Sequence, residues 1–370
     1  MKILIITTSY PTKDNPARGI FLKKIVNNLI KNGIFVDVLN LEKYKALTVG
    51  AGILPNLKKS WKARLQFPVY LIHLYFSIIK RASKCDVIHA NWGLTAFLAL
   101  LAKPFHRKKI ILSERSSQLI YTNSKLLKLI LKLVYNNVNK MVVISGNSMD
   151  SVSNIYGVPN ISVIPNGVEF KDKMLKFNTN KIKNALHLRK DSRIILFVGR
   201  LTSVKSVSYL IEGFNLAKIK NKILIIVGTG EEELKLKELA LKLGIDKNIL
   251  FIGQVNPEQT GKYFSIADVF VLPSIMETGG NVLLEALTFD VPIISTNVGW
   301  AQDFIINNQN GYIINKRDSL DIKNKLELLL NDKKNYLRIK KNVNHTVKTK
   351  LISWEKCAKL YIEQYKLLNK

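Results

Sequence analysis

The sequence predicts an α/β protein with two doubly wound, Rossmann-like domains, each built around a parallel sheet. Three observations support this fold class. Short apolar runs typical of buried strands alternate with amphipathic helical runs along the chain. The alternation begins again near residue 169, after a break. The chain also has 370 residues, which is enough for two domains with separate hydrophobic cores.

The first domain is expected to span residues 1–168. Residues 2–7 read as a strand, residues 20–31 as an amphipathic helix with Gly33 at its C-terminal cap, and residues 34–39 as the next strand. This order of elements is typical of parallel sheets. Further strands are expected at 87–89, 110–112, 141–144 and 161–164.

The second domain is expected to span residues 169–350. Its apolar runs predict strands at 194–199, 223–228, 249–253, 269–272 and 292–295, with helices between them. A final helix is expected over residues 351–370.

The composition is that of a globular protein, with 47% apolar and 23% charged residues. Only two cysteines are present, Cys85 and Cys357, which excludes a disulfide framework and suits a reducing compartment. The apolar run at residues 3–6 is better explained by a first strand than by a signal peptide. The apolar stretch 67–79 is interrupted by Pro68 and His73 and is shorter than the ~20 residues that span a bilayer. These features favour a cytoplasmic protein without a membrane-spanning helix.

The net charge of +30 is unevenly distributed. Residues 1–168 hold 24 Lys and Arg against 6 Asp and Glu, so 24 − 6 = +18, whereas residues 169–370 hold 33 against 21, so 33 − 21 = +12. A field of this kind attracts anionic polymers or anionic membrane surfaces. A lysine-rich surface that serves only solubility is the alternative.

The most informative segment is residues 274–286, which follows the expected strand 269–272. It contains two glutamates, Glu277 and Glu285, separated by the turn Gly279-Gly280-Asn281 and followed by an apolar helical run. A strand, a glycine turn and a helix present free backbone N–H groups at a helix N-terminus, which suits an anion such as a diphosphate. Acids on either side of that anion could hold sugar hydroxyl groups, so the layout fits a nucleotide sugar.

This segment resembles the Glu-x7-Glu motif of the retaining glycosyltransferases of family four. The segment 197–201 with Lys205 is similar to the family's Val-Gly-Arg-Leu-x3-Lys signature, 226–230 and 251–255 match the next two strand ends, and 165–168 resembles its interdomain hinge. Ser353 and Trp354 resemble the start of its closing helix. The resemblance implies the two-domain GT-B fold, with a C-terminal domain that binds the donor, an N-terminal domain that binds the acceptor, and a closing helix that crosses back to the N-terminal domain.

The resemblance also implies roles for individual residues. Glu285 is expected to bind the ribose hydroxyls, and Glu277 the hydroxyls of the transferred sugar, close to the amides of Gly279, Gly280 and Asn281. Arg200 and Lys205 are expected to offset the charge of the leaving diphosphate without a metal. Lys205 is followed by Ser206, whereas the family usually has glycine at that position.

Four residues of the first domain are candidates for the acceptor side or for its flexible loop. Arg18 and Gly19 belong to the first loop, because glycine allows close approach of a ligand and arginine can reach an anion. His89 lies in a segment similar to the family's His-x-His-Trp segment, although a lone histidine at a strand end is more often structural. Arg115 stands where relatives often have histidine; it cannot act as a base, but it could bind a phosphate group.

Several other classes of site are absent from the sequence. No Asp-x-Asp motif, Cys/His cluster or Gly-x-x-x-x-Gly-Lys phosphate loop occurs. We therefore expect no metal and no cofactor, with the nucleotide sugar as substrate. Two alternatives remain, namely a nucleotide-sugar epimerase of the same fold and a basic nucleic-acid-binding protein, although no recognition motif supports nucleic acid as a partner.

The basic residues of the first domain predict association with an anionic membrane. They form clusters around Trp61, near residues 80–84, near 107–109, and along the leucine-rich helix 125–134. Buried leucines with solvated lysines are the alternative for any one of these segments. Because the first domain is expected to hold the acceptor, the clusters favour a glycan or lipid-linked acceptor. They also favour a peripheral enzyme of cell-surface polysaccharide or glycolipid synthesis at the inner face of the cytoplasmic membrane.

Overall fold

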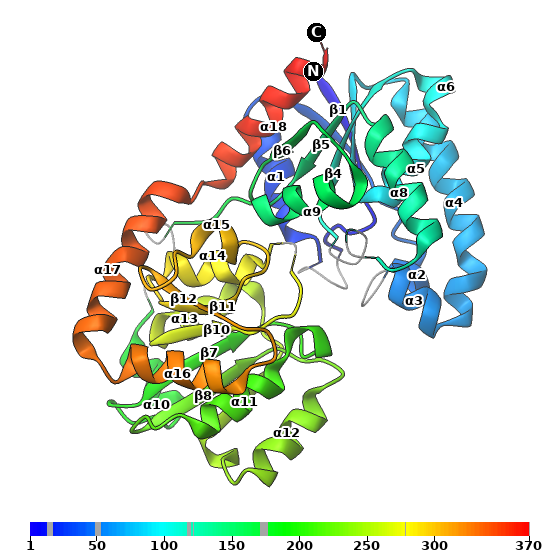
Figure 1. Cartoon of the computed structure of the whole chain (residues 1–370). Helices are drawn as coiled ribbons and strands as arrows, with labels where there is room; N and C mark the ends of the chain where they lie inside the picture. The colour runs from blue at the N-terminus through cyan, green and yellow to red at the C-terminus, as the bar shows by residue number, and fades with distance from the viewer. Residues whose placement is uncertain are drawn as a thin grey trace. The chain divides into compact units, whose positions relative to one another are not determined.

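The computed structural model describes residues 1–12, 18–48, 53–116, 120, 122–170, 177–277 and 279–369. The chain divides into two compact units (Figure 1). Unit 1 comprises Met1–Gly167 and Trp354–Lys370, and unit 2 comprises Val168–Ser353. Both units contain a six-stranded parallel sheet, so the predicted α/β class is confirmed.

The sheet of unit 1 has the strand order β2-β1-β3-β4-β5-β6. The chain starts at β1 and adds β2 on one side and β3 to β6 on the other, so the topological switch point lies between β1 and β3. The strands are β1 (Lys2–Ile6), β2 (Phe35–Leu39), β3 (Val87–Asn91), β4 (Lys109–Glu114), β5 (Lys140–Val143) and β6 (Ile161–Val163).

Helices cover both faces of this sheet. One face packs against α4, α5 and α8 through a core that contains Ile6, Ile88 and Leu112. The other face carries α18, whose Tyr365 bonds to His89 of β3, and α1 packs against α18. The helices of unit 1 are α1 (Ile20–Lys31), α2 (Lys45–Thr48), α3 (Ile53–Lys59), α4 (Trp61–Ala82), α5 (Gly93–Leu101), α6 (Lys103–His106), α8 (Lys125–Asn137), α9 (Gly146–Tyr156) and α18 (Trp354–Asn369).

Unit 2 repeats this architecture with the strand order β12-β11-β10-β7-β8-β9. Its switch point lies between β7 and β10, which pair directly. The strands are β7 (Arg193–Val198), β8 (Lys222–Val227), β9 (Ile249–Gly253), β10 (Val269–Leu272), β11 (Ile293–Thr296) and β12 (Gly311–Ile314). The edge strand β12 was not among the strands expected from the sequence.

The helices of unit 2 flank this sheet. They are α10 (Thr179–Ala185), α11 (Val207–Leu216), α12 (Glu233–Lys242), α13 (Pro257–Ile266), α14 (Asn281–Thr288), α15 (Ala301–Phe304), α16 (Ser319–Leu330) and α17 (Lys333–Lys350), with short 3-10 helices η2 (Ser203–Lys205) and η3 (Asp246–Asn248). The expected final helix at 351–370 corresponds to α18, which begins later, at Trp354, because residues 351–353 are not helical and Val168 forms a bridge with Ser353.

Helix α4 runs through the apolar stretch 67–79. Pro68 lies inside this helix of 22 residues and does not interrupt it. Proline lacks only its own N–H group, so it removes one intrahelical bond, the bond to the carbonyl of Arg64. Among the described residues, no helix is both long and apolar enough to cross a membrane.

Candidate active site

The loops that follow β7 and β10 meet at the switch point of unit 2. Helix η2 ends at Lys205, and the backbone N–H of Ile275 donates to the carbonyl of Val204 at 2.8 Å, which joins the two loops. The ammonium group of Lys205 pairs with Oε1 of Glu277. The sequence expectation that both residues serve one site is consistent with this contact, since ligands of open α/β sheets bind beyond the strand ends at the switch point.

The Lys205–Glu277 pair is largely buried. The side chain of Lys205 is 18% exposed and that of Glu277 is 12% exposed. The hydroxyl of Ser274, which is fully buried, donates to Oε1 of Glu277 at 3.0 Å. Glu277 therefore keeps a fixed position, with one oxygen committed to internal donors. Ser274 was not predicted as a site residue, although a polar residue two positions after a buried strand could have indicated it.

A glycine turn leads from Glu277 into α14. Gly280 adopts φ 87° and caps the helix, and its carbonyl accepts from the N–H of Leu283 at 2.8 Å. The carbonyl of Gly279 accepts from the N–H of Trp300 at 3.0 Å, so the loop after β11 fixes the turn. Asn281 is the first residue of α14 and is exposed. Thr278, within this turn, lies outside the described residues.

Glu285 lies in the second turn of α14 and is half-buried. Its Oε2 accepts from the hydroxyl of Thr260, on α13, at 3.5 Å. Along the chain, Glu277 precedes the N-terminus of α14 and Glu285 follows it. A helix N-terminus attracts anions through its unpaired N–H groups and its dipole.

The cation Arg200 lies two residues beyond the end of β7, and its side chain is exposed. Within the described part of the chain, no carboxylate pairs with it. The neighbouring backbone is tightly fixed, because a Cβ on Gly228 would lie 2.0 Å from the carbonyl oxygen of Gly199. Glycine is therefore required where the ends of β7 and β8 approach each other.

Ser206 occupies the position at which the family usually has glycine. It adopts φ 54°, in the left-handed region, is 5% exposed, and is followed directly by α11. The backbone requires a positive φ here, which explains why glycine suits this position. The serine keeps this conformation at a cost of about 1–2 kcal/mol.

Arg18 and Gly19 are placed by the first loop of unit 1. Arg18 is directed at its own loop, where it donates to the carbonyl of Thr8 and to Oγ of Ser9. Gly19 adopts φ 62°, and a Cβ there would lie 2.4 Å from the carbonyl oxygen of Ser9. The close approach that glycine allows at this position is therefore to the backbone of Ser9, in the same loop. Residues 13–17 of this loop lie outside the described residues.

His89 is fully buried inside unit 1 rather than exposed at the strand end. Its Nδ1 lies 2.6 Å from the hydroxyl of Tyr365, and its Nε2 lies 2.8 Å from Oγ of Ser113. Burial, assisted by the charge of Arg115, lowers the pKa of His89 to about 3. The neutral ring thus joins β3, β4 and α18, which is the structural role that a lone histidine usually has.

Arg115 is also buried and has partners within unit 1. Its guanidinium donates to Oδ1 of Asn166 at 2.6 Å and to the hydroxyl of Tyr361 at 2.8 Å, and it lies 4.9 Å from the ring centre of Phe21. These contacts join the end of β4, α1, α18 and the segment before Val168. This gives Arg115 a structural role that the sequence did not indicate.

Glu114, which precedes Arg115, was not singled out in the sequence. It is fully buried and accepts hydrogen bonds from the N–H groups of Gly93, Arg115 and Ser116 and from the hydroxyl of Tyr135, at 2.9 Å each. Burial raises the pKa of Glu114 to about 7. The carboxylate anchors the carboxyl end of β4 to α5 and α8.

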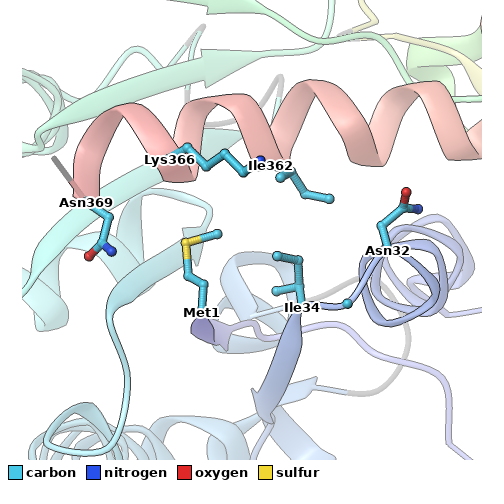
Figure 2. A pocket seen from close by; sticks show the side chains of 7 residues that line it. Met1, Asn32, Ile34, Ile362, Lys366 and Asn369 are labelled. Atoms are coloured by element: carbon cyan, nitrogen blue, oxygen red, sulfur yellow. The ribbon is translucent and has the colours of Figure 1, made fainter.

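Two further observations concern metal binding and cavities. No group of three or more His, Cys, Asp or Glu residues in the described ranges could hold a metal ion. A cavity of about 520 Å³ in unit 1 is lined by Met1, Ile34, Ile362 and Lys366 (Figure 2). It lies beside the start of β1, at the amino ends of the strands, and therefore away from the edge where ligands of α/β sheets bind.

Two family models match the chain. The model described as "Glycosyl transferases group 1" matches residues 178–346, within unit 2, and the model "Glycosyltransferase Family 4" matches residues 19–172, almost wholly within unit 1.

Three relatives illustrate the range of similar proteins. An uncharacterized glycosyltransferase of Methanocaldococcus jannaschii is 27% identical, over 99% of this chain and 98% of its own length. The capsular polysaccharide biosynthesis glycosyltransferase CapM of Staphylococcus aureus is 32% identical, over 53% and 52% of the two chains. The alpha-monoglucosyldiacylglycerol synthase of Acholeplasma laidlawii is 30% identical, over 43% and 42%.

Solved structures share the fold over the whole chain. Sucrose-phosphate synthase from Thermosynechococcus elongatus has a TM-score of 0.81 at 19% identity, with 100% of this chain and 99% of that chain covered. Anabaena HepE in complex with UDP-glucose has a TM-score of 0.78 at 16% identity, with 99% and 100% covered. The chain therefore belongs to glycosyltransferase family 4 and is a nucleotide-sugar-dependent glycosyltransferase with the GT-B fold.

Proposed function

We propose that this enzyme transfers a sugar from a nucleoside diphosphate sugar to a hydroxyl group, with retention of configuration and without a metal ion. The observation that carries the proposal is the Lys205–Glu277 pair at the switch point of unit 2, beside the N-terminus of α14. A cation, an acid and a helix N-terminus are the groups that a sugar diphosphate requires.

Charge determines how the donor would lie. The diphosphate would take the N-terminus of α14, beside Gly280 and Asn281, and Arg200 and Lys205 would offset its negative charge. Glu277 pairs with Lys205 and compensates its charge. The ammonium group is therefore already held at the site, and little reorganisation would be required when the phosphates bind.

The two acids would hold the hydroxyl groups at the ends of the donor. Glu277 takes hydroxyls of the transferred sugar, with its Oε2 turned to the ligand because Oε1 bonds Ser274 and Lys205. Glu285, on the other side of the helix start, takes the vicinal ribose hydroxyls. The UDP-glucose complex of Anabaena HepE supports a uridine nucleotide as the first donor to test.

The leaving diphosphate would itself accept the proton of the acceptor hydroxyl on the face from which it departs. The glycosidic bond to the diphosphate breaks as the bond to the acceptor oxygen forms on the same face, so the configuration is retained. The enzyme supplies positioning and charge stabilisation, and it needs no nucleophile of its own.

The acceptor would be a glycan or a lipid-linked molecule at the inner face of the cytoplasmic membrane, in cell-surface polysaccharide or glycolipid synthesis. The names of two relatives, a capsular polysaccharide biosynthesis glycosyltransferase and an alpha-monoglucosyldiacylglycerol synthase, support these acceptor classes. The basic surface of unit 1 supports a peripheral association with the membrane.

A thermal-shift screen against UDP, GDP, ADP and their sugars tests the donor site. We expect stabilisation by one nucleotide diphosphate series, and a much weaker effect of the matching nucleoside. In Arg200→Ala and Lys205→Ala, affinity for the diphosphate should fall far more than affinity for the nucleoside.

Lys235→Ala is the matched control, because Lys235 is an exposed lysine of unit 2 on α12. Equal loss of diphosphate affinity in this control, or unchanged affinity in both site variants, would contradict the proposed donor site. Transfer activity should also survive EDTA; activity that is lost on chelation and restored by magnesium or manganese would reject the metal-free mechanism.

A further inference from the structure

Helix α4 of unit 1 carries a row of large apolar side chains on its outer face. Trp61, Leu65, Val69, Ile72 and Phe76 are each more than half exposed. Their spacing of three or four residues places them in one line along the helix. The buried residues Ala63, Tyr70, Leu74, Ile78 and Ala82 form the opposite face, which packs on the core. This outer row is therefore an apolar surface in addition to the core face.

The apolar row continues onto neighbouring elements. Phe105 of α6 is 67% exposed, and its ring contacts that of Tyr75, which in turn contacts Phe76. Helix α8 presents a second apolar line, formed by Leu126, Leu129 and Leu133. Helix α5 lies between α4 and α8 and contacts both, so the three helices form one layer (Figure 1). We call the exposed apolar residues of α4, α6 and α8 the apolar face.

Cations border the apolar face at both ends of α4 and on α8. Exposed members of this border are Lys58, Lys59, Lys62, Arg64, Lys80, Lys84, Arg107, Lys125, Lys128 and Lys132. Acids are almost absent, because the sequence has no Asp or Glu between Glu42 and Asp86, or between Asp86 and Glu114, which is buried. The surface thus combines apolar side chains with a positive rim.

The combination of apolar side chains with a positive rim favours one class of partner over the others. A second copy of the chain would bring two positive rims together, and like charges across an interface are unfavourable. A nucleic acid would use the cations but leave the aliphatic side chains in water, because nucleic acids are bound through phosphates and base stacking. An anionic bilayer satisfies both features, since apolar side chains enter the acyl boundary while Lys and Arg meet the headgroups.

We propose that the apolar face of α4, α6 and α8 is the membrane-docking surface of the enzyme and that its partner is a bilayer with anionic headgroups. The inference specifies the membrane association included in the proposed function. At about 1.5 Å per residue, the 22 residues of α4 form a rod of about 33 Å. The rod would lie in the plane of the interface, with Trp61 and Phe76 of α4 and Phe105 of α6 as its exposed aromatic contacts.

Flotation with vesicles tests the docking surface. Wild-type protein should float at low salt with vesicles that contain phosphatidylglycerol and phosphatidylcholine, should not float with phosphatidylcholine alone, and should be released by high salt. The variant Ile72→Glu with Phe76→Glu should lower the partition coefficient at least about tenfold, because two apolar groups leave the acyl boundary. Replacing Lys58, Lys59 and Lys62 by glutamine should lower it roughly 100-fold, at about fivefold for each cation.

The matched control is Leu234→Glu with Leu241→Glu on α12 of unit 2, where both leucines are similarly exposed. It should float like the wild type. Trp61 also serves as a reporter, since brominated phosphatidylglycerol vesicles should quench its fluorescence. Trp61→Phe should remove most of that quenching, because Trp300 is fully buried and Trp92 and Trp354 are half-buried and lie outside the apolar face.

Three results would contradict the proposal that the apolar face docks on a membrane. These are equal flotation of the Ile72→Glu/Phe76→Glu variant, absence of flotation with either vesicle type, and a wild-type dimer in sedimentation that this variant abolishes. Thermal shift with nucleotide sugars, run on the same samples, separates this failure from a failure of the proposed function, because the donor residues lie in unit 2.

Discussion

Replacing Gly299 by alanine should disable the donor turn while leaving the fold of unit 2 in place. Gly299 has φ 55° in the loop after β11, directly against the glycine turn that follows β10. A Cβ at this position would lie 2.4 Å from the carbonyl oxygen of Gly279 and 2.9 Å from Cβ of Glu277. Both contacts are to the segment that we propose binds the donor.

The size of the effect follows from these distances. Ordinary van der Waals contact of a Cβ begins near 3.4 Å, so the Gly279 carbonyl must move by 3.4 − 2.4 = 1.0 Å. A displacement of about 1 Å in a positioning group can reduce turnover about 10²-fold. The positive φ adds a loss of stability of about 1–2 kcal/mol, which is independent of the donor.

Gly244→Ala is the matched control. Gly244 also lies in unit 2 and has φ 67°, but a Cβ there has no atom within 4 Å. Both variants should lose about 1–2 kcal/mol of stability in urea denaturation from the positive φ, and Gly299→Ala should lose more because its Cβ clashes with backbone. Only Gly299→Ala should lose turnover and donor affinity in the folded protein. Equal kinetics in the two variants would refute the argument that the Gly279 carbonyl and Glu277 must be held in place by this loop.

The remaining predictions concern the acids, one serine and one histidine. Glu285→Gln should weaken nucleotide affinity about 10–100-fold and Glu277→Gln should mainly lower turnover, because hydrogen bonds to a charged group contribute ~1.5–3 kcal/mol; wild-type titrations and kinetics in both would remove the basis of the donor site. Ser206→Gly should raise the free energy of unfolding by about 1 kcal/mol, since it relieves a positive φ, and a lower Tm would contradict this. The lowered pKa of His89 means that its contribution to stability is lost as pH falls from about 6.5 toward 3, by about 2 kcal/mol at pH 5. In the His89→Gln variant this loss should be absent. The raised pKa of Glu114 should then make the free energy of unfolding of that variant rise as pH falls from about 7 to 4.5. The same pH dependence in wild type and variant, measured by urea denaturation, would contradict the role given to His89.

Much of the fold could be predicted because strand and helix patterns are local. The strand at 269–272 and the helix 20–31 were predicted with the bounds that the structure gives. The edge strand β12 was not predicted, because its four residues begin with glycine and carry only a short apolar pattern. The continuity of α4 through Pro68 was not predicted, because proline usually ends or kinks a helix.

The candidate site was also predictable only in part. The segments that contribute Lys205 and Glu277 were recognisable in the sequence, but their direct contact depends on which strands are neighbours, and that is a property of the whole sheet. The environments of His89 and Arg115 were not predictable, because their partners on α18 are about 250 residues away along the chain or more. The role of each of these two residues is decided by burial, which a single local pattern does not report.

Hydrogen exchange measured by mass spectrometry, with and without a saturating nucleoside diphosphate sugar, tests the central claim most directly. The account predicts that the ligand slows exchange in two segments of unit 2, residues 199–206 and 279–288, which contain Lys205 and Glu285. Segments on α12 should exchange at the same rate in both samples. Protection confined to unit 1, or binding of the donor without protection of either segment, would contradict the assignment of the donor site to the switch point between β7 and β10.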